Sequence, residues 1–233
     1  MDRDRTLERV GELGLLAVVR GDSRAAALEV VDALVEGGVL GIEITFTTPE
    51  AERVMEDLKD EYGDRILLGA GTIERREQVE QAVAAGATFL VSPGCDPDLV
   101  SGMRDTGLAV MPGALTPSEV MLARRLGADA VKLFPGSLGG PPYLKALRGP
   151  FPDATLLPTG GVSEENVRDW FAAGAFAVGA GGALAPRLLR TNATVRRSSP
   201  GRARSPPQHT RPHAPPGQVR TRFRAAGWSL RGA

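Results

Sequence analysis

One lysine of the sequence stands in an unusual setting. Lys132 lies within the run AVKLFP, an otherwise apolar stretch that predicts a buried β-strand. The other two lysines of the chain, Lys59 and Lys145, fall in helical or loop segments. Burial favours a neutral amine over the ammonium ion, and the neutral amine is the nucleophile that forms imines with carbonyl compounds. Lys132 is therefore a candidate for covalent chemistry on a carbonyl group.

A carboxylate occupies a similar position in an earlier run, GIEITFT, which also predicts a strand. Alternate residues of a strand share a face, so Glu43, Thr45 and Thr47 lie on one face of it. On the other strand, Lys132 and Phe134 share the corresponding face. If both faces point into a common interior, Glu43 and Lys132 converge there.

Two interpretations of such a pair remain open. It can be a structural Lys–Glu ion pair that fills the interior, as buried pairs sometimes do. Alternatively, it can be a catalytic amine beside its general acid–base, because the carboxylate can move the protons that imine chemistry requires. The carboxylate favours the ammonium ion while burial opposes it, so the net protonation cannot be read from the sequence. We favour the catalytic interpretation.

The distribution of histidine and cysteine excludes several other mechanisms. Both histidines, His209 and His213, follow residue 186, and Cys95 is the single cysteine. Residues 1–186 therefore cannot hold a Ser-His-Asp triad, a Cys-His pair or a His-ligated zinc ion. Proton chemistry there must use carboxylates, lysine, tyrosine or the single thiol. With one cysteine no internal disulfide can form, which suits a reducing cytosol.

Eight short apolar runs alternate with segments of helical period. The runs cover residues 15–20, 41–47, 67–72, 88–93, 108–113, 130–135, 155–160 and 176–181. This alternation predicts a parallel sheet covered by helices. Eight such units, and no G-x-G-x-x-G after the first strand, favour an α/β (β/α)8 TIM barrel over an open doubly wound sheet.

Helix boundaries have their own signals in this pattern. Thr116, Pro117 and Glu119 predict a capped helix start, and SEEN at 163–166 predicts another. Glycines predict the ends of four helices, at 37–38, 86, 127 and 174.

Polar residues and glycines gather where the predicted strands end, and in a parallel barrel those ends meet at one mouth. They are Arg20, Glu43, Thr45, Thr47, Thr72, Pro93, Pro112, Lys132, Phe134, Thr159, Gly160, Gly161 and Gly179–Gly182. The glycine-rich loops after the seventh and eighth strands predict a phosphate site made of backbone N–H groups. The alternative is two tight turns that need glycine for positive φ.

The last unit of the barrel is incomplete in the sequence. Residues 187–233 contain 11 of the 28 basic residues and no Asp or Glu, so residues 1–186 carry 17 basic and all 28 acidic residues. We therefore expect a barrel over 1–186 and a disordered Arg/Pro-rich tail over 187–233. A nucleic-acid-binding arm is one interpretation of this tail. We favour a frameshifted reading frame, because the composition changes abruptly where a helix is due.

We expect a cytoplasmic location. No apolar run reaches the ~18 residues of a transmembrane helix, and the first ten residues lack the apolar core of a secretory signal. A membrane partner is accordingly not expected.

Several motifs, in this order, resemble the 2-keto-3-deoxy-6-phosphogluconate (KDPG) aldolase / 4-hydroxy-2-oxoglutarate aldolase family. They are GIEITFTTPEA, GAGTI, FLVSPG, MPGALTPSE, VKLFPG, PTGGVSEEN and AVGAGGAL, and the likeness runs over about residues 8–186. The resemblance implies a class I aldolase on a (β/α)8 barrel that acts on a phosphorylated keto acid. It also implies a homotrimer that needs no metal and no cofactor.

The resemblance further implies roles for individual residues. Lys132 would be the Schiff-base lysine and Glu43 the general acid–base. The implied substrate contacts are Thr72 and Pro93 at the pyruvate end, Phe134 beside the imine, Thr159 near the C4 hydroxyl, and the N–H groups of Gly160, Gly161, Gly181 and Gly182 at the phosphate.

Two positions depart from the family pattern. Many members have Arg at the position of Thr47, where it binds the substrate carboxylate, and we expect Arg20 to replace it here. Members often have Ser at the position of Gly182, so a phosphate contact is lost.

Three alternatives remain. The enzyme can cleave 4-hydroxy-2-oxoglutarate or the phosphogalactonate epimer instead of KDPG. It can be a phosphate-binding barrel isomerase or synthase of another class. It can also be an inactive, basic-tailed product that binds nucleic acid, although we do not expect a nucleic-acid partner.

Overall fold

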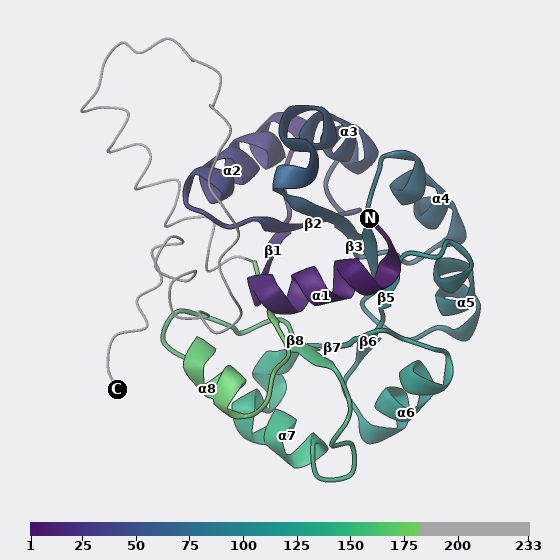
Figure 1. The fold of residues 1–233 in the computed structure, drawn as a ribbon, viewed down its shortest axis with the longest axis vertical. Helices are drawn as coiled ribbons and strands as arrows, with labels where there is room; N and C mark the ends of the chain where they lie inside the picture. Colours follow the sequence, from purple (N-terminus) through teal and green to yellow (C-terminus); the bar gives the residue numbers. More distant parts are fainter. Residues whose placement is uncertain (182–233) are drawn as a thin grey trace.

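The apolar runs form short parallel strands with helices packed around them (Figure 1). The computed structural model describes residues 1–181. Gly182, the expected boundary at residue 186 and the expected tail of residues 187–233 lie outside the described residues. The strands are β1 (Leu15–Val19), β2 (Gly41–Thr45), β3 (Leu67–Gly71), β4 (Phe89–Val91), β5 (Ala109–Met111), β6 (Gly113–Ala114), β7 (Val131–Leu133), β8 (Leu156–Pro158) and β9 (Val178–Ala180).

Within the described residues, every strand except β5 and β9 is followed by a helix of the barrel's outer layer. The helices are α1 (Arg3–Leu13), α2 (Arg24–Glu36), α3 (Ala51–Tyr62), α4 (Arg76–Ala84), α5 (Pro97–Asp105), α6 (Pro117–Arg125), α7 (Gly140–Leu147) and α8 (Val167–Ala172), with short 3₁₀ turns at Gly63–Arg65 and Gly136–Leu138. No helix among residues 1–181 combines the length and the apolar character that a membrane crossing requires.

The strands close on themselves as a barrel. The hydrogen-bonded order β5-β4-β3-β2-β1-β9 makes one curved sheet, and β6-β7-β8 makes a second. β5 and β6 are two parts of one strand interrupted at Pro112, whose carbonyl still accepts the Lys132 N–H at 2.9 Å. On the other side, the Phe176 N–H donates to the Leu156 carbonyl at 2.9 Å and joins β9 to β8. The eight predicted strands and the closed barrel are thus confirmed for the described residues, and the open sheet is not formed.

Helix termini follow the predicted signals with one exception. At the start of α6 the Thr116 hydroxyl accepts the Glu119 N–H, and the Glu119 carboxylate accepts the Thr116 N–H, as the capping box requires. The prediction of a helix start at 163–166 is wrong by several residues, because α8 begins at Val167 with Asn166 as its N-cap residue. The Asn166 side chain holds the preceding turn by accepting the Ser163 N–H at 2.9 Å.

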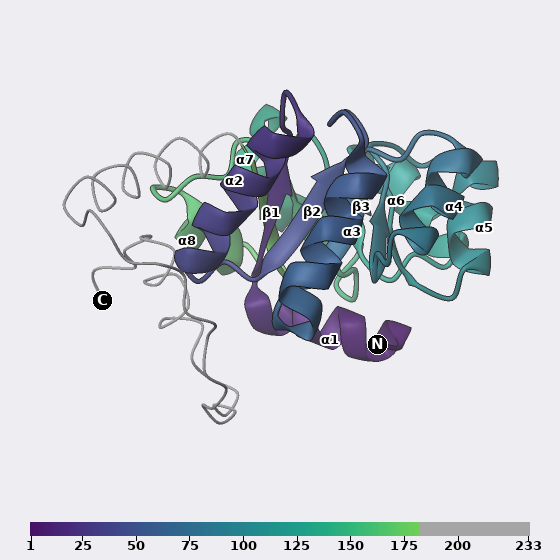
Figure 2. The same ribbon diagram turned by 90° about the horizontal axis from the view of Figure 1, so that it is seen from above.

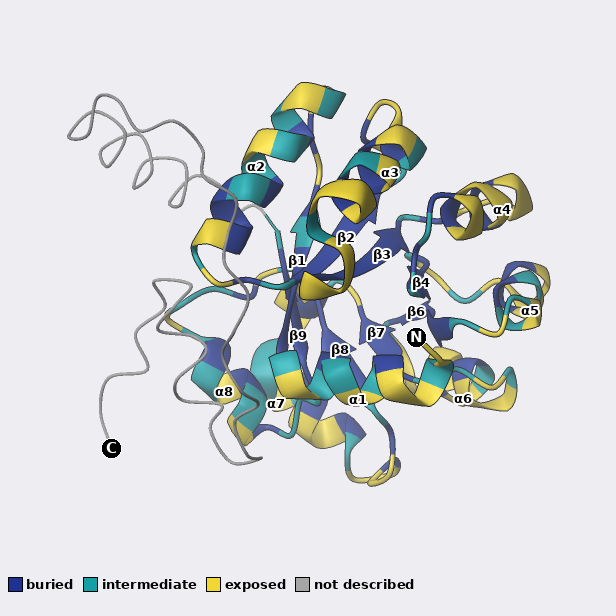
Figure 3. Cartoon of the chain, turned by 45° about the horizontal axis from the view of Figure 1, so that its top comes forward, coloured by how far each residue is buried: buried dark blue, intermediate teal, exposed yellow. Residues whose placement is uncertain are grey.

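The period of two along each strand separates two apolar layers. Ile42, Ile44 and Leu133 face the helices and are fully buried in the outer layer. A second cluster fills the floor of the barrel, and its strand members are Leu16, Leu67, Phe89, Val91, Ala109, Met111 and Leu157. Helix α1 lies across this end of the barrel and adds Val10 to the floor (Figures 1 and 2). Figure 3 shows the resulting pattern, with buried strands in the centre and exposed residues on the outer faces of the helices.

Candidate active site

A buried ion pair lies inside the barrel, above its apolar floor. The Lys132 Nζ atom is 3.3 Å from Oε1 of Glu43, and the two side chains are only 6% and 1% exposed. Lys132 comes from β7 and Glu43 from β2, and both are at inward-facing positions, as the alternation predicts. The geometry brings a basic and an acidic group together where little solvent competes for them, so a proton can pass directly between them.

An aromatic ring and a hydroxyl lie near this pair, toward the mouth of the barrel. The Phe134 ring centroid is 5.4 Å from Lys132 Nζ, close enough for a cation–π contact, and Phe134 is itself 38% exposed. Thr159 directly follows β8, and its Oγ1 atom is buried with no hydrogen-bond partner among the described residues. A buried hydroxyl without a partner is unfavourable, so this group is suited to bind a polar atom of a ligand.

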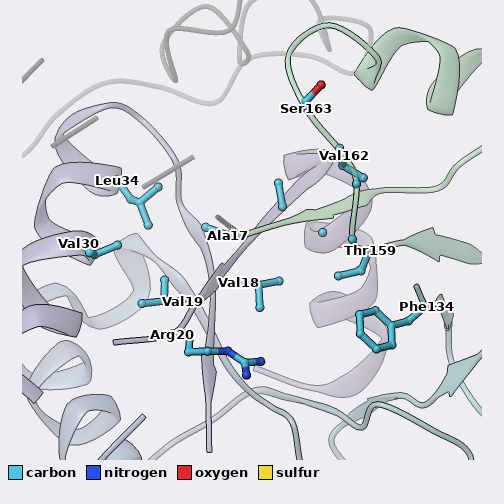
Figure 4. Close-up of a pocket in the computed structure, with 15 residues that line it drawn as sticks. Ala17, Val18, Val19, Arg20, Val30, Leu34, Phe134, Thr159, Val162 and Ser163 are labelled. Atoms are coloured by element: carbon cyan, nitrogen blue, oxygen red, sulfur yellow. The ribbon is translucent and has the colours of Figure 1, made fainter. Parts of the chain in front are cut away.

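A cavity of about 680 Å³ opens at this end of the barrel (Figure 4). The predicted site residues that line it are Arg20, Phe134, Thr159, Gly160, Gly161 and Gly181. Its remaining wall includes Val30 and Leu34 of α2 and the outward-facing Ala17 and Val19 of β1, so the cavity continues beyond the barrel wall. Lys132 and Glu43 are buried in the barrel interior and are not part of this lining.

Arg20 brings a positive charge to the mouth. It follows β1 directly and continues the inward-facing series of Leu16 and Val18. Figure 4 shows its guanidinium group extending toward the side of the cavity that carries Phe134. No ion pair or hydrogen bond of this guanidinium occurs within the described part of the chain. A free guanidinium in this position is suited to bind a carboxylate through two parallel hydrogen bonds.

Thr47 lies at the same rim but is held by other hydroxyl groups. Its Oγ1 atom is 3.0 Å from Oγ1 of Thr45, and Thr45 donates to the Val19 carbonyl at 3.1 Å. This chain of contacts connects the end of β2 to the end of β1, beside Arg20. Thr47 is exposed and does not line the cavity, so a direct contact with a ligand is less favoured for it than for Arg20.

The loop after β8 lines the cavity with two successive glycines. Gly160 and Gly161 have φ angles of 85° and 78°, which glycine adopts readily, and their N–H groups make no backbone hydrogen bond within the described residues. Successive N–H groups of this kind form a concave anion site. The Asn166 side chain donates to the Gly161 carbonyl at 2.7 Å and fixes the loop. Asn166 lies in the SEEN motif, but its contact with the glycine loop was not predicted, because that contact depends on how the chain folds back.

The two remaining predicted residues, Thr72 and Pro93, follow β3 and β4 at the same end of the barrel. Both are half-buried, and neither lines the cavity. Thr72 has a φ angle of 54°, which is strained for a β-branched residue and is found most often near functional sites.

The thiol of Cys95 contributes no reactive group. Burial, together with the charges of Glu119 and Asp96, raises its pKa, so the nucleophilic thiolate is disfavoured. Within the described residues no group of three or more His, Cys, Asp or Glu side chains is arranged to hold a metal ion.

Comparison with known proteins gives consistent matches. Residues 7–197 match the family described as KDPG and KHG aldolase. The 2-dehydro-3-deoxy-6-phosphogalactonate aldolase of Escherichia coli K12 is 35% identical over 81% of this chain and 90% of its own length. The 2-dehydro-3-deoxy-phosphogluconate aldolase of Pseudomonas aeruginosa is 40% identical over 69% of this chain and 73% of its own.

A solved structure is similar over most of the barrel. The KDPG aldolase of Legionella pneumophila, with pyruvate captured as a covalent carbinolamine intermediate, superposes with a TM-score of 0.69 and 31% identity. The match covers 79% of this chain and 91% of that one.

Proposed function

The chain belongs to the KDPG and KHG aldolase family, and on this premise we propose that Lys132 is the residue that forms the imine. The protein is a lyase, an aldolase that works through a Schiff base. Its reaction is the cleavage of 2-keto-3-deoxy-6-phosphogluconate to pyruvate and glyceraldehyde 3-phosphate. The observation that carries the assignment of Lys132 is its buried contact with Glu43, 3.3 Å away in the interior of the barrel.

This contact can supply the two groups that the first step needs, a neutral amine as nucleophile and a neutral carboxylic acid as proton donor. Moving one proton from Lys132 Nζ to Glu43 leaves a neutral amine and a neutral acid. The amine attacks the C2 ketone of the substrate, and the acid returns the proton as the carbinolamine loses water. The product of this step is an iminium ion, which withdraws electrons from the neighbouring carbon–carbon bonds.

Cleavage then uses Glu43 as a base. Its carboxylate removes the proton of the C4 hydroxyl, the C3–C4 bond breaks, and glyceraldehyde 3-phosphate leaves. The electron pair of that bond remains on the Lys132-bound fragment as an enamine. Protonation of the enamine at C3 and addition of water release pyruvate and regenerate the amine. General acid–base assistance of this kind contributes about 10²–10⁴-fold to the rate.

The groups at the mouth would orient the substrate along the cavity. Arg20 binds the carboxylate next to the ketone, and the N–H groups of Gly160 and Gly161 bind the phosphate. Thr159 provides its unpartnered hydroxyl to the C4 hydroxyl, and Phe134 covers the imine. Gly181, which also lines the cavity, adds to the phosphate site, and by the family resemblance Thr72 and Pro93 flank the pyruvate moiety.

We further propose that the enzyme is a homotrimer, as the family resemblance implies. Leu138 is 71% and Met121 54% exposed, so these two apolar side chains are candidates for burial in such an interface. Light scattering coupled to size-exclusion chromatography tests this proposal, and a monomer at micromolar concentration would contradict it.

The identity of the substrate is tested with a coupled assay that measures pyruvate release by the full chain. KDPG, its galactonate epimer and 4-hydroxy-2-oxoglutarate are compared at equal concentration. We expect the highest kcat/KM for KDPG. The galactonate epimer is the second candidate, because a relative of this chain carries the phosphogalactonate name. A higher kcat/KM for the epimer would assign it as the substrate, and no pyruvate from any of the three would contradict the proposed reaction.

A further inference from the structure

A glycine on β3 leaves the space in which the Glu43 carboxylate lies. An ideal Cβ atom built on Gly71 would be 1.9 Å from Oε1 of Glu43, 2.5 Å from its Cδ and 2.6 Å from its Cγ. All three nearest atoms belong to Glu43, and carbon atoms of real side chains do not approach one another this closely. The backbone of Gly71 has no positive φ, so an alanine here would force Glu43 to shift but would not strain the conformation of the strand.

The strand register explains why the contact is made with Gly71. In the β2–β3 ladder Glu43 is directly opposite Gly69, and Thr45 is opposite Gly71. The Glu43 side chain therefore leans along the strand toward the mouth of the barrel, as side chains in strands commonly do. It reaches Lys132 by passing over the Cα atom of Gly71.

The carboxylate has no equivalent position nearer the floor. The space above Gly69 is filled by the ring of Phe89, which would be 2.3 Å from a Cβ atom at that position. Phe89 belongs to the fully buried floor of the barrel and cannot retreat without opening a cavity. Glu43 is thus confined between Phe89 below and the open space over Gly71.

We propose that Gly71 is a positioning residue for catalysis, because its missing side chain holds the Glu43 carboxylate within reach of Lys132 and the substrate. This inference rests on the proposed proton-transfer role of Glu43. Gly71 does not touch the substrate, and its effect passes through Glu43. A methyl group at this position would displace the carboxylate and leave Lys132 in place.

The two halves of the reaction separate this role from general structural damage. Imine formation requires the amine of Lys132 and is slowed, but not prevented, when Glu43 is displaced, while exchange of the C3 protons of pyruvate with deuterium requires an acid–base at the enamine. For Gly71→Ala we expect the borohydride-trapped pyruvate adduct to form and the KM to change less than about threefold. The kcat for cleavage and the C3 exchange rate, followed by NMR in D₂O, should both fall about 10- to 100-fold, since a displaced base loses much of its effect.

Gly94→Ala is the matched control. Gly94 follows β4 at the same end of the barrel, and a Cβ atom there would meet no atom within 4 Å. We expect wild-type exchange for it. The decisive variant is Gly71→Ala combined with Glu43→Ala, which removes the clashing side chain. In that background Gly71→Ala should lower neither the residual exchange rate nor the melting temperature, whereas in the wild-type background it should lower both.

Unchanged exchange in Gly71→Ala would overturn the inference, and so would an equal loss in the Glu43→Ala background. A separate outcome tests the premise. If Glu43→Gln alone leaves exchange at the wild-type rate, Glu43 has no role in proton transfer, and both the proposed mechanism and this inference are wrong.

Discussion

Lys132 and Glu43 form a buried ion pair across the barrel, with Nζ 3.3 Å from Oε1 although 89 positions separate them in the sequence. Their strands β7 and β2 lie on opposite sides of the closed barrel, so the contact exists only when the barrel has closed. Neither side chain has an alternative partner of opposite charge among the described residues. The pair therefore couples the stability of the interior to the groups that perform the reaction.

This coupling predicts an unequal effect of single and double substitutions on stability. Lys132→Met leaves the Glu43 carboxylate buried without a partner and should lower the free energy of unfolding by about 3–5 kcal/mol. Adding Glu43→Gln removes the uncompensated charge and should restore at least half of the loss. Urea unfolding of the variants measures both effects. Lys145→Met, at an exposed position, is the control and should change stability by less than about 0.5 kcal/mol. Equal effects of the single and double variants would contradict a coupled pair.

Arg20 is predicted to bind the carboxylate next to the reacting ketone. A charge-assisted hydrogen bond is worth about 1.5–3 kcal/mol, so Arg20→Ala should raise the KM for the keto acid by about 10- to 100-fold with a smaller effect on kcat. Steady-state kinetics measure this separation. Arg24→Ala is the control, because Arg24 pairs with Asp57 at the surface and not with the cavity. An unchanged KM for Arg20→Ala would transfer the carboxylate role to another residue.

Gly179 is predicted to influence which epimer is cleaved. A Cβ atom at Gly179 would be 2.2 Å from Oγ1 of Thr159, the hydroxyl that has no partner within the described residues. Gly179→Ala should displace this hydroxyl and lower the kcat/KM ratio of the gluconate over the galactonate substrate by about tenfold.

Thr159→Val serves as the comparison for this prediction. It should produce a similar shift in the epimer ratio, and the double variant should add nothing to it, because both changes remove the same contact. An unchanged ratio in Gly179→Ala would show that the Thr159 hydroxyl does not discriminate between the epimers.

Glu119 is predicted to stabilise the fold in a pH-dependent manner. Hydrogen bonds from the N–H groups of Thr116 and Leu115 and from the Thr116 hydroxyl lower the pKa of this carboxyl below its ordinary value of 4.5. A group with a lowered pKa in the folded state stabilises above its unfolded pKa, and this contribution is lost as the pH falls through the folded pKa.

The wild type should therefore melt above Glu119→Gln at pH 7, and the difference should diminish as the pH falls below about 4.5. Melting curves between pH 3 and pH 7 measure this trend. A difference that is constant over the whole range would contradict a role for the ionised carboxylate.

The sequence could predict which strand side chains point into the barrel and which toward the helices, because the side-chain period of a strand is fixed at two. That period places Glu43 and Lys132 in the interior once eight units predict a closed barrel. The break at Pro112 was not predicted, and it divides one expected strand into β5 and β6. Proline has no N–H to donate to the ladder, which explains the interruption.

Other features depended on tertiary contacts that no local pattern specifies. Helix α1 has clear termini, with Asp2 as N-cap and Gly14 in the left-handed conformation, but its function as the floor of the barrel is visible only in the fold. Gly71 is the second glycine of the GAGT motif. Its physical reason is the approach of the Glu43 carboxylate, and this approach becomes visible only with the β2–β3 register. Helix α8 begins later in the sequence than predicted, because the Asn166 side chain stabilises a turn where the first residues of the helix were expected.

The central claim is that the amine of Lys132 bonds covalently to the substrate ketone. Incubation of the full chain with pyruvate and sodium borohydride, followed by peptide mass spectrometry, tests it most directly. We predict one reduced pyruvate adduct per chain, located on Lys132 and absent from Lys132→Ala. An adduct on Lys59 or Lys145, or no adduct in a chain that still cleaves the substrate, would contradict the account.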